Sequence, residues 1–499
     1  MMMSDLFKIN NFKKKYISYL IIFIGLILQL IYLYQFDDYY DDWNFFYTVD
    51  PNISNAQTWQ RHYFGDRGDG GILKEAFPWN FSYITKYFLK FTEYTIEATH
   101  YFLLFFSALS YFFFYKFIKL ISKDYKFILL ASIIFATNLF LIRELNSLRP
   151  HSAVMLLSLL SNYLFISIFI KNKRKISNFI FYIIFTICML SLWPHSLALL
   201  VGHFVFLLIF FLKKKKIFDL CVPLIILILY LALNYKYIIY ITVENDWSYT
   251  PFSYTFFINF FFRSFFGSIF FGGIMLLIFF FYLLKEIKIN FYYYKKNKYF
   301  SNIPFLKKNY QINFILINIL CIYGAIILYS VLKESVIAPK YFLILMPLII
   351  IWLSLKINEE KKKYIYNLII IITILNSIYF WNNLPISRPP MREVLRIIDS
   401  NNIKNIYTTE TIVFNNYLSH YRYAIKNKFV IEKIENLKDT EVIKNFAVVC
   451  LNYPRAFFGV SNIDSEDPKC FEVFKNKNLQ IKKKITVPDF LIFIVEIKV

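Results

Sequence analysis

The segment QFDDYYDDWNFF (residues 35–46) contains four carboxylates that could perform acid–base chemistry, namely Asp37, Asp38, Asp41 and Asp42. In a helix, side chains four positions apart share one face, so each aspartate of the first pair would meet its counterpart in the second. Like charges held together raise at least one pKa, and a carboxyl group that titrates nearer neutrality suits a general base. A solvated cap at the end of a membrane span is the other explanation, and charge alone leaves both open.

A second set of candidates consists of cations and histidines at the ends of apolar segments. They occur in IRELNSLRPHS (142–152), LWPHSL (192–197) and LKESVIAPKYF (332–342). Arginine and lysine can hold a phosphate group, although a single cation at a membrane surface is equally explained by an apolar stem that lies in lipid. We expect five residues to bind a phosphate group or another part of a substrate, namely Arg61, Arg149, His151, His195 and Lys340.

Membrane-spanning helices are expected to position these residues, because the composition excludes an ordinary soluble protein. Of the 499 residues, 58% are hydrophobic and 21% are aromatic. An uncharged stretch of about 17–25 residues is long enough to cross the hydrocarbon core of a bilayer. Eleven such stretches are predicted, at residues 16–34, 98–118, 127–142, 150–170, 177–192, 196–212, 217–241, 264–284, 312–332, 341–357 and 364–381.

The lysines and arginines predict the orientation of these spans, since short cytoplasmic loops carry an excess of basic residues. When the chain is threaded in order, all the basic runs fall on one side: FKKKY (12–16), KFIKLISKDYK (116–126), KNKRK (171–175), KKKK (213–216), KEIKINFYYYKKNK (285–298) and KINEEKKK (356–363). Residues 1–15 are therefore predicted to be cytoplasmic, in a multi-pass protein of the plasma (inner) membrane. This topology explains the net charge of +23 and argues against nucleic acid as a partner.

Two regions on the opposite face, which is external or periplasmic, are large enough to have a function. The loop 35–97 contains ten acidic residues and five basic ones. The tail 385–499 alternates short apolar segments with helical patches, which predicts a small α/β domain after a membrane domain of residues 16–381. Cys450 and Cys470 in this tail could form a disulfide in an oxidising compartment, and a buried free thiol at Cys450 is an equal alternative.

Several motifs are absent from the sequence, and their absence limits the classes of reaction that the protein could catalyse. The sequence has no G-x-x-x-x-G-K-[ST] phosphate loop and no G-x-G-x-x-G that opens a helix. No spacing of cysteine and histidine indicates zinc or haem. We therefore expect no cofactor and leave a requirement for a divalent metal open. The expected chemistry takes place on the external face and uses no nucleotide.

The order of the motifs along the chain resembles that of the membrane-embedded GT-C glycosyltransferases. An acidic pair directly follows the first span, and the further motifs are FPWNFSYITKYFLKF (77–91), LRPHSAVMLLSLLSNYLF (148–165), WPHSLALLVGHFVFLLI (193–209) and APKYFLILMPLIII (338–351). Within that class the chain looks most like the family-39-like group, which includes the protein O-mannosyltransferases and aminoarabinose transferases. The similarity covers the predicted membrane domain and leaves the tail uncovered.

This resemblance implies a reaction and roles for individual residues. It implies that a sugar is transferred from a polyprenyl-phosphate donor to a lipid, glycan or protein acceptor at the surface of the membrane lipids. In such enzymes an aspartate after the first span acts as base on the acceptor hydroxyl. YYDDWNF matches best, so Asp41 is the first choice and Asp42 the second, with Asp37 and Asp38 as alternative bases. Lys340 stands where relatives often have an arginine that could hold the donor phosphate.

Three other functions are weighed against this one. A transporter or flippase for a lipid-linked saccharide would need polar residues inside its spans and helices broken by Gly or Pro, whereas the chain has only 11 glycines. An O-antigen ligase or polymerase would also use external Arg and His, but the early acidic pair argues against it. A non-catalytic membrane scaffold is the third alternative.

Overall fold

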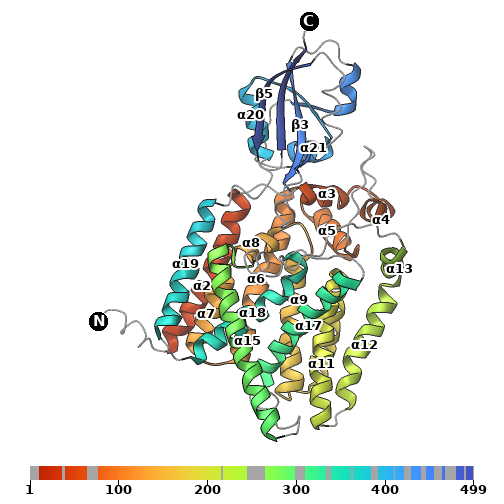
Figure 1. Ribbon diagram of the computed structural model, residues 1–499. Coiled ribbons are helices and arrows are strands. Elements are labelled where there is room, and N and C mark those ends of the chain that lie inside the picture. The colour runs from red at the N-terminus through yellow and green to blue at the C-terminus, as the bar shows by residue number, and fades with distance from the viewer. Residues whose placement is uncertain are drawn as a thin grey trace. The chain divides into compact units, whose positions relative to one another are not determined.

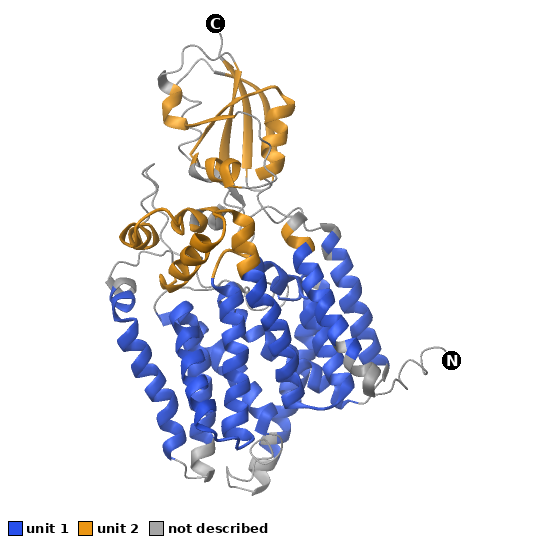
Figure 2. Cartoon of the chain, turned by 180° about the vertical axis from the view of Figure 1, so that it is seen from behind, with its two compact units in different colours: residues 1–30, 103–146, 150–381 blue, residues 31–102, 147–149, 382–499 orange. Residues whose placement is uncertain are grey.

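The computed structural model forms two compact units (Figure 2), the first made of residues 1–30, 103–146 and 150–381, and the second of residues 31–102, 147–149 and 382–499. The structure describes residues 11–35, 40–64, 77–214, 217–243, 265–297, 310–332, 339–360, 363–383, 391–409, 411–420, 429–439, 445–454, 464–466, 479–487 and 490–497. Each unit is described by itself below.

The first unit is built from helices (Figure 1). Its elements are, wholly or for the most part, α2 (Asn11–Gln35), α6 (Ile96–Ile121), α7 (Tyr125–Ala136), α8 (Leu139–Asn146), α9 (His151–Phe165), η1 (Ile166–Ile170), α10 (Ile176–Leu192), η2 (Pro194–Ser196), α11 (Leu197–Lys214), α12 (Ile217–Leu233), α13 (Tyr235–Val243), α15 (Ile269–Asn297), α17 (Tyr310–Leu332), η5 (Pro339–Leu345), α18 (Met346–Glu359) and α19 (Lys363–Asn383). This confirms the mostly helical fold expected from the apolar stretches.

The lengths of the apolar helices bear on the predicted number of spans. Among the described residues, five helices are long and apolar enough to cross a membrane, and a sixth is added if the bent pair α7 and α8 counts as one span. Shorter apolar helices of 10–17 residues cover 19–33, 176–192, 194–209, 217–233 and 364–379. Each of the eleven predicted stretches overlaps one of these segments, while the number of spans itself stays a prediction.

The stretch predicted as a single span at 127–142 is broken in the structure. Helices α7 and α8 meet at an angle of 52°. Asn138 lies at the break, where its Oδ1 accepts a hydrogen bond from the Leu141 N–H at 3.0 Å and its Nδ2 donates to the Phe265 carbonyl at 2.6 Å. The Asn138 side chain therefore acts as an N-cap, because it accepts a hydrogen bond from a free N–H group in the first turn of α8. A single polar residue within an apolar run thus lies where the chain bends.

Helix packing in this unit depends on close approach at Gly202. Helices α11 and α17 meet there, and a Cβ atom placed on Gly202 would lie 2.3 Å from Oδ1 and 3.2 Å from Cα of Asn318. A polar network continues beside this contact, in which His203 lies 2.8 Å from the Tyr182 hydroxyl and 3.2 Å from Oδ1 of Asn162. His203, Tyr182 and Asn162 are thus partnered with one another within the apolar helices.

The second unit begins with three short helices, α3 (Tyr40–Thr48), α4 (Asn55–Phe64) and α5 (Asn80–Phe91). Two buried side chains tie α4 to α5. His62 Nε2 donates to the Phe77 carbonyl at 2.6 Å, which leaves Nδ1 to accept a hydrogen bond from the Ser82 hydroxyl at 2.9 Å. Lys86 Nζ donates to the Ile53 carbonyl at 2.6 Å and to the Thr58 hydroxyl at 3.0 Å.

The tail folds as the predicted small α/β domain. Its elements are α20 (Met391–Ser400), β1 (Asn405–Thr408), α21 (Thr411–His420), β2 (Val430–Lys433), η7 (Ile434–Asp439), β3 (Asn445–Pro454), β4 (Asp464–Glu466), β5 (Leu479–Val487) and β6 (Phe490–Ile497). The strand order is β2-β1-β3-β6-β5, with β4 paired to β3. Strand β1 pairs in parallel with β2 and β3, whereas β3, β6 and β5 pair antiparallel. The predicted C-terminal sheet is confirmed.

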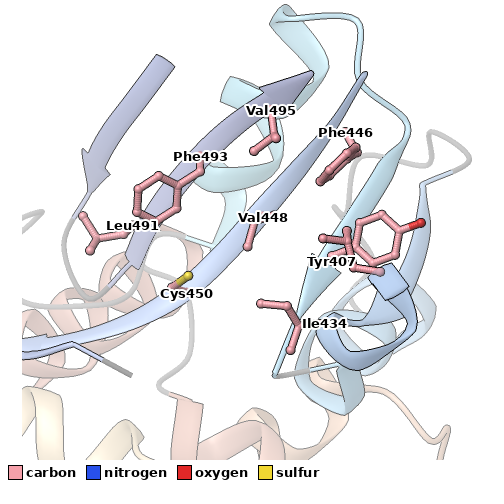
Figure 3. Close-up of a cluster of buried hydrophobic side chains, with 9 residues drawn as sticks. Tyr407, Ile434, Phe446, Val448, Cys450, Leu491, Phe493 and Val495 are labelled. Atoms are coloured by element: carbon pink, nitrogen blue, oxygen red, sulfur yellow. The ribbon is translucent and has the colours of Figure 1, made fainter. Parts of the chain in front are cut away.

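Alternating residues of the central strands build the core of this domain. Phe446, Val448 and Cys450 of β3 lie beside Leu491, Phe493 and Val495 of β6 (Figure 3), as expected when every second side chain of a strand faces the core. Cys450 is fully buried and disulfide-bonded, so the prediction of a buried free thiol there is wrong. The predicted partner Cys470 lies outside the described residues.

Candidate functional site

The second acidic pair of the segment 35–46 belongs to helix α3 of the second unit. Positions 41 and 42 fall in the first turn of this helix, which starts at Tyr40. The free N–H groups and the positive end of the helix dipole favour carboxylates at such positions. Asp37, Asp38 and the side chains of Asp41 and Asp42 lie outside what the structure describes, so the expected pairing across one helical turn stays a prediction.

The rest of α3 is fixed by aromatic packing. Trp43, Phe45 and Phe46 are completely buried. The Phe46 ring stacks on Tyr94 with centroids 4.4 Å apart, and the Tyr94 hydroxyl donates to the Phe46 carbonyl at 3.0 Å. The Phe45 ring stacks on Phe81 of α5 at 5.5 Å. The backbone that carries Asp41 and Asp42 is therefore continuous with a tightly packed segment.

Arg61 has a structural role in addition to the phosphate-binding role expected from the sequence. Its Nη1 donates to the Tyr47 carbonyl at 2.9 Å, and its guanidinium lies 3.9 Å from the centre of the Tyr47 ring. Tyr47 is in the last turn of α3, where carbonyl groups have no partner within the helix and a cation is favourable. Arg61 therefore stabilises the C-terminal end of the acidic helix.

Arg149 lies in the second unit beside the buried histidine of α4. Its guanidinium is 5.4 Å from the Phe77 ring centre. Burial lowers the pKa of His62 to about 3, against the hydrogen bond with the Phe77 carbonyl, which raises it, and the positive charge of Arg149 lowers it further. His62 is therefore neutral at physiological pH, and its hydrogen bonds are those of a structural residue.

The other three predicted binding residues meet in the first unit around two aromatic rings. His151 begins α9 and lies edge-on to Trp193 at 5.0 Å between centroids. His195 stacks on Tyr341 at 4.3 Å, and Trp193 stacks on the same ring at 5.8 Å. Lys340 Nζ lies 5.6 Å from the centre of the Tyr341 ring. We call these residues, His151, Trp193, His195, Lys340 and Tyr341, the histidine–aromatic cluster.

Glu144 of α8 connects a fourth element to this cluster. Its Oε1 accepts hydrogen bonds from Nη2 of Arg143 at 2.8 Å and from Nε of the same residue at 3.1 Å, while Oε2 lies 3.2 Å from Nδ1 of His151. Glu144 and His151 are both buried, with exposed fractions of 9% and 2%. Glu144 therefore places a buried carboxylate beside the His151 imidazole.

Comparison with protein-family models finds no match, and comparison with curated proteins finds none either. The chemistry is therefore argued from the residues themselves.

The histidine–aromatic cluster has unused hydrogen-bonding capacity. In the described part of the chain, neither Nε2 of His151 nor Nδ1 of His195 has a hydrogen-bond partner, although both atoms are buried. Burial, followed by the nearby charge of Lys340, lowers the pKa of His195 to about 4, so that imidazole is neutral. Buried polar atoms are normally partnered. One unpartnered ring nitrogen from each histidine and an ammonium group, all beside aromatic rings, are suited to a ligand that carries both an anion and hydroxyl groups.

The predicted residues thus form two groups. His151, His195 and Lys340 come together in the first unit, whereas Arg61, Arg149 and helix α3 belong to the second. The described ranges contain no group of three His, Cys, Asp or Glu that could hold a metal ion. Because the carboxylates of α3 are outside those ranges, the question of a divalent metal is left open.

Sequence reasoning missed the aromatic members of the cluster. Trp193 and Tyr341 had no role in the prediction, because single aromatic residues carry little information in a chain with 21% aromatic residues. Their positions in the sequence could have identified them, because Trp193 lies two residues before His195 in LWPHSL and Tyr341 directly follows Lys340 in APKYF. Glu144 was recognised as a charged neighbour, but its contact with His151 depends on the bend at Asn138 and has no local signature.

Proposed function

We propose that the protein is a membrane glycosyltransferase that moves a sugar from a polyprenyl-phosphate donor to a lipid, glycan or protein acceptor on the external face. In this proposal all eleven apolar segments cross the membrane and the N-terminus is cytoplasmic. The GT-C-like architecture suggested by the motifs would place the second unit outside the cell, in the periplasm of a double-membrane organism.

The observation that carries the proposal is the convergence of His151, His195 and Lys340 on the Trp193 and Tyr341 rings. These residues come from three separate stretches of the chain that the sequence assigns to one face. Lysine is a common phosphate ligand, and an aromatic face with a few convergent polar groups is typical of sites for organic ligands. A sugar linked to a phosphate presents both features.

The proposed reaction needs three contributions from the chain. The carboxylate of Asp41 takes the proton of the acceptor hydroxyl, and the acceptor oxygen forms a bond to the anomeric carbon as that carbon's bond to the phosphate oxygen breaks. Lys340 holds the departing polyprenyl phosphate, whose negative charge increases in the transition state. Attack from the face opposite the phosphate inverts the anomeric centre. The donor already carries its leaving group, so no nucleotide is required.

Two observations support the proposed sidedness. Three of the basic runs lie together in the first unit, where Lys285 pairs with Glu360 at 2.7 Å and the Asn358 amide donates to Asp124 at 2.8 Å. Cys450 of the second unit is disulfide-bonded, and disulfides persist mainly outside the reducing cytoplasm. Both fit a cytoplasmic basic end and an external tail.

The test is to reconstitute the purified protein in vesicles with short-chain polyprenyl-phosphate sugars and total envelope lipid as acceptor. The proposal predicts release of polyprenyl phosphate together with a new glycolipid, and less of both products in Lys340→Met when the donor is supplied below its KM. If no donor from a panel of hexoses and pentoses yields free polyprenyl phosphate with any acceptor fraction, the proposal is wrong.

A transporter or flippase of a lipid-linked saccharide is the second candidate, and two features of the first unit favour it. The pair α7 and α8 is bent by 52°, and α8 carries the buried Glu144. A polar network also joins His203 to Tyr182 within the apolar helices. Broken helices and buried polar residues are typical of transport pathways. The same vesicles distinguish the two, since a flippase would move the donor between leaflets and leave its phosphate bond intact.

A further inference from the structure

Helix α21 of the C-terminal domain packs directly on the acidic helix α3. The Tyr417 ring meets the Trp43 ring edge-on with centroids 5.6 Å apart, and the His420 ring meets Phe46 at 5.4 Å. Trp43 and Tyr417 are both essentially buried. The two contacts lie about one helical turn apart in the middle of α3, so α21 packs on the central part of that helix.

His420 belongs to a group of three rings. It lies 4.5 Å from Tyr94, which itself stacks on Phe46 at 4.4 Å. A hydrogen bond with the Tyr94 backbone joins His420 to the segment before α6, and burial lowers the pKa of this histidine below its usual value. The neutral imidazole therefore connects three parts of the second unit that are far apart in sequence.

Helix α3 depends on such contacts for its structure. It has only nine residues, and isolated helices shorter than about 12–15 residues are marginal in water. Its position must come from tertiary packing. That packing is supplied by Tyr94, by Arg61 at the last turn, and by Tyr417 and His420 from the tail.

We propose that helix α21 is a positioning element for Asp41 and Asp42, so that the C-terminal domain contributes to sugar transfer without touching a substrate. The inference rests on the proposed function, because it gives the tail a role in the same site. Tyr417 and His420 act through Trp43 and Phe46 on the backbone that carries the carboxylates. Displacing a catalytic group by about 1 Å can cost on the order of 100-fold in rate.

The test compares Tyr417→Ala and His420→Ala with Asn415→Ala and Ser419→Ala, which change exposed residues of the same helix. Hydrogen exchange of the α3 amides and the kinetics of transfer are measured on the full-length protein. The inference predicts faster exchange in α3 and a fall in kcat of about 10-fold to 100-fold for the first two variants. The donor KM should change by less than about 3-fold, because Lys340 and the histidines of the cluster are untouched, and Tyr417→Phe should retain activity.

Unchanged α3 exchange in Tyr417→Ala and His420→Ala, or full kcat despite faster exchange, would overturn the inference. Asp41→Asn, measured in the same assay, distinguishes failure of the positioning role of α21 from failure of the base assignment. If Asp41→Asn is inactive while the α21 variants remain fully active, only the positioning role fails. If Asp41→Asn is fully active, the base assignment fails, and the positioning role fails with it.

Discussion

The His195 imidazole stacks on the Tyr341 ring at 4.3 Å between centroids, although one residue precedes α11 and the other precedes α18. This contact joins two turns that the sequence places on the same face of the membrane. It also sets Lys340, the neighbour of Tyr341, beside two histidines with unpartnered ring nitrogens. The contact is therefore the centre of the site from which the proposed function is argued.

Lys340 is expected to bind the phosphate of the donor. Lys340→Met removes the ammonium group and keeps most of the apolar stem, so we predict a rise in donor KM of at least about 10-fold, as expected for a lost charged hydrogen bond worth about 1.5–3 kcal/mol. Lys340→Arg keeps the charge and should bind within about 3-fold of the wild type. An unchanged KM in Lys340→Met would remove this residue from the donor site.

His62 predicts how the stability of the second unit depends on pH. Burial lowers its pKa to about 3 from a usual value of 6.5, so folding favours the neutral form. The stabilisation is complete above about pH 6.5 and is lost as the pH falls toward 3, and the loss by pH 5 amounts to about 2 kcal/mol.

The measurement for His62 is hydrogen exchange of the α4 and α5 amides, with each rate corrected for the pH dependence of the intrinsic exchange rate. Local stability should decrease between pH 7 and pH 5 in the wild type and in Ser82→Ala, which retains the imidazole. In His62→Gln the decrease should be smaller by about 2 kcal/mol. Equal pH dependence in the wild type and His62→Gln would contradict the assignment.

Gly202 and Gly324 form a matched pair for testing helix packing in the first unit. A Cβ atom at Gly202 would overlap Asn318, whereas at Gly324 it would meet nothing within 4 Å. We predict that Gly202→Ala destabilises the protein by about 1–3 kcal/mol and that Gly324→Ala is neutral or slightly stabilising, because alanine favours the helix. Unfolding temperatures in one detergent compare the two variants, and equal values would contradict this packing.

Local pattern predicted a large part of the fold. The apolar stretches predicted the positions of the helices because length and hydrophobicity are local properties, and the alternating segments of the tail predicted its strands. The break at Asn138 was missed because a single polar residue in an apolar run does not interrupt the hydropathy pattern. Only its contact with the Phe265 carbonyl reveals it.

The candidate site was predicted less completely, because its geometry depends on contacts between distant segments. His151, His195 and Lys340 were predicted from their polar side chains at the ends of apolar segments, and these three residues do come together. Arg61 has the same charge but holds the Tyr47 carbonyl. The packing of Tyr417 on Trp43 joins residues of a loop and a tail that no spacing rule connects.

The most direct test of the central claim is the transfer assay with Asp41→Asn. We predict that this variant folds with wild-type unfolding temperature and binds donor with unchanged KM, while release of polyprenyl phosphate falls at least about 1000-fold, since the acceptor hydroxyl loses its base. Asp42→Asn and Asp38→Asn, measured in the same assay, should retain more activity. Wild-type turnover in Asp41→Asn would contradict the account.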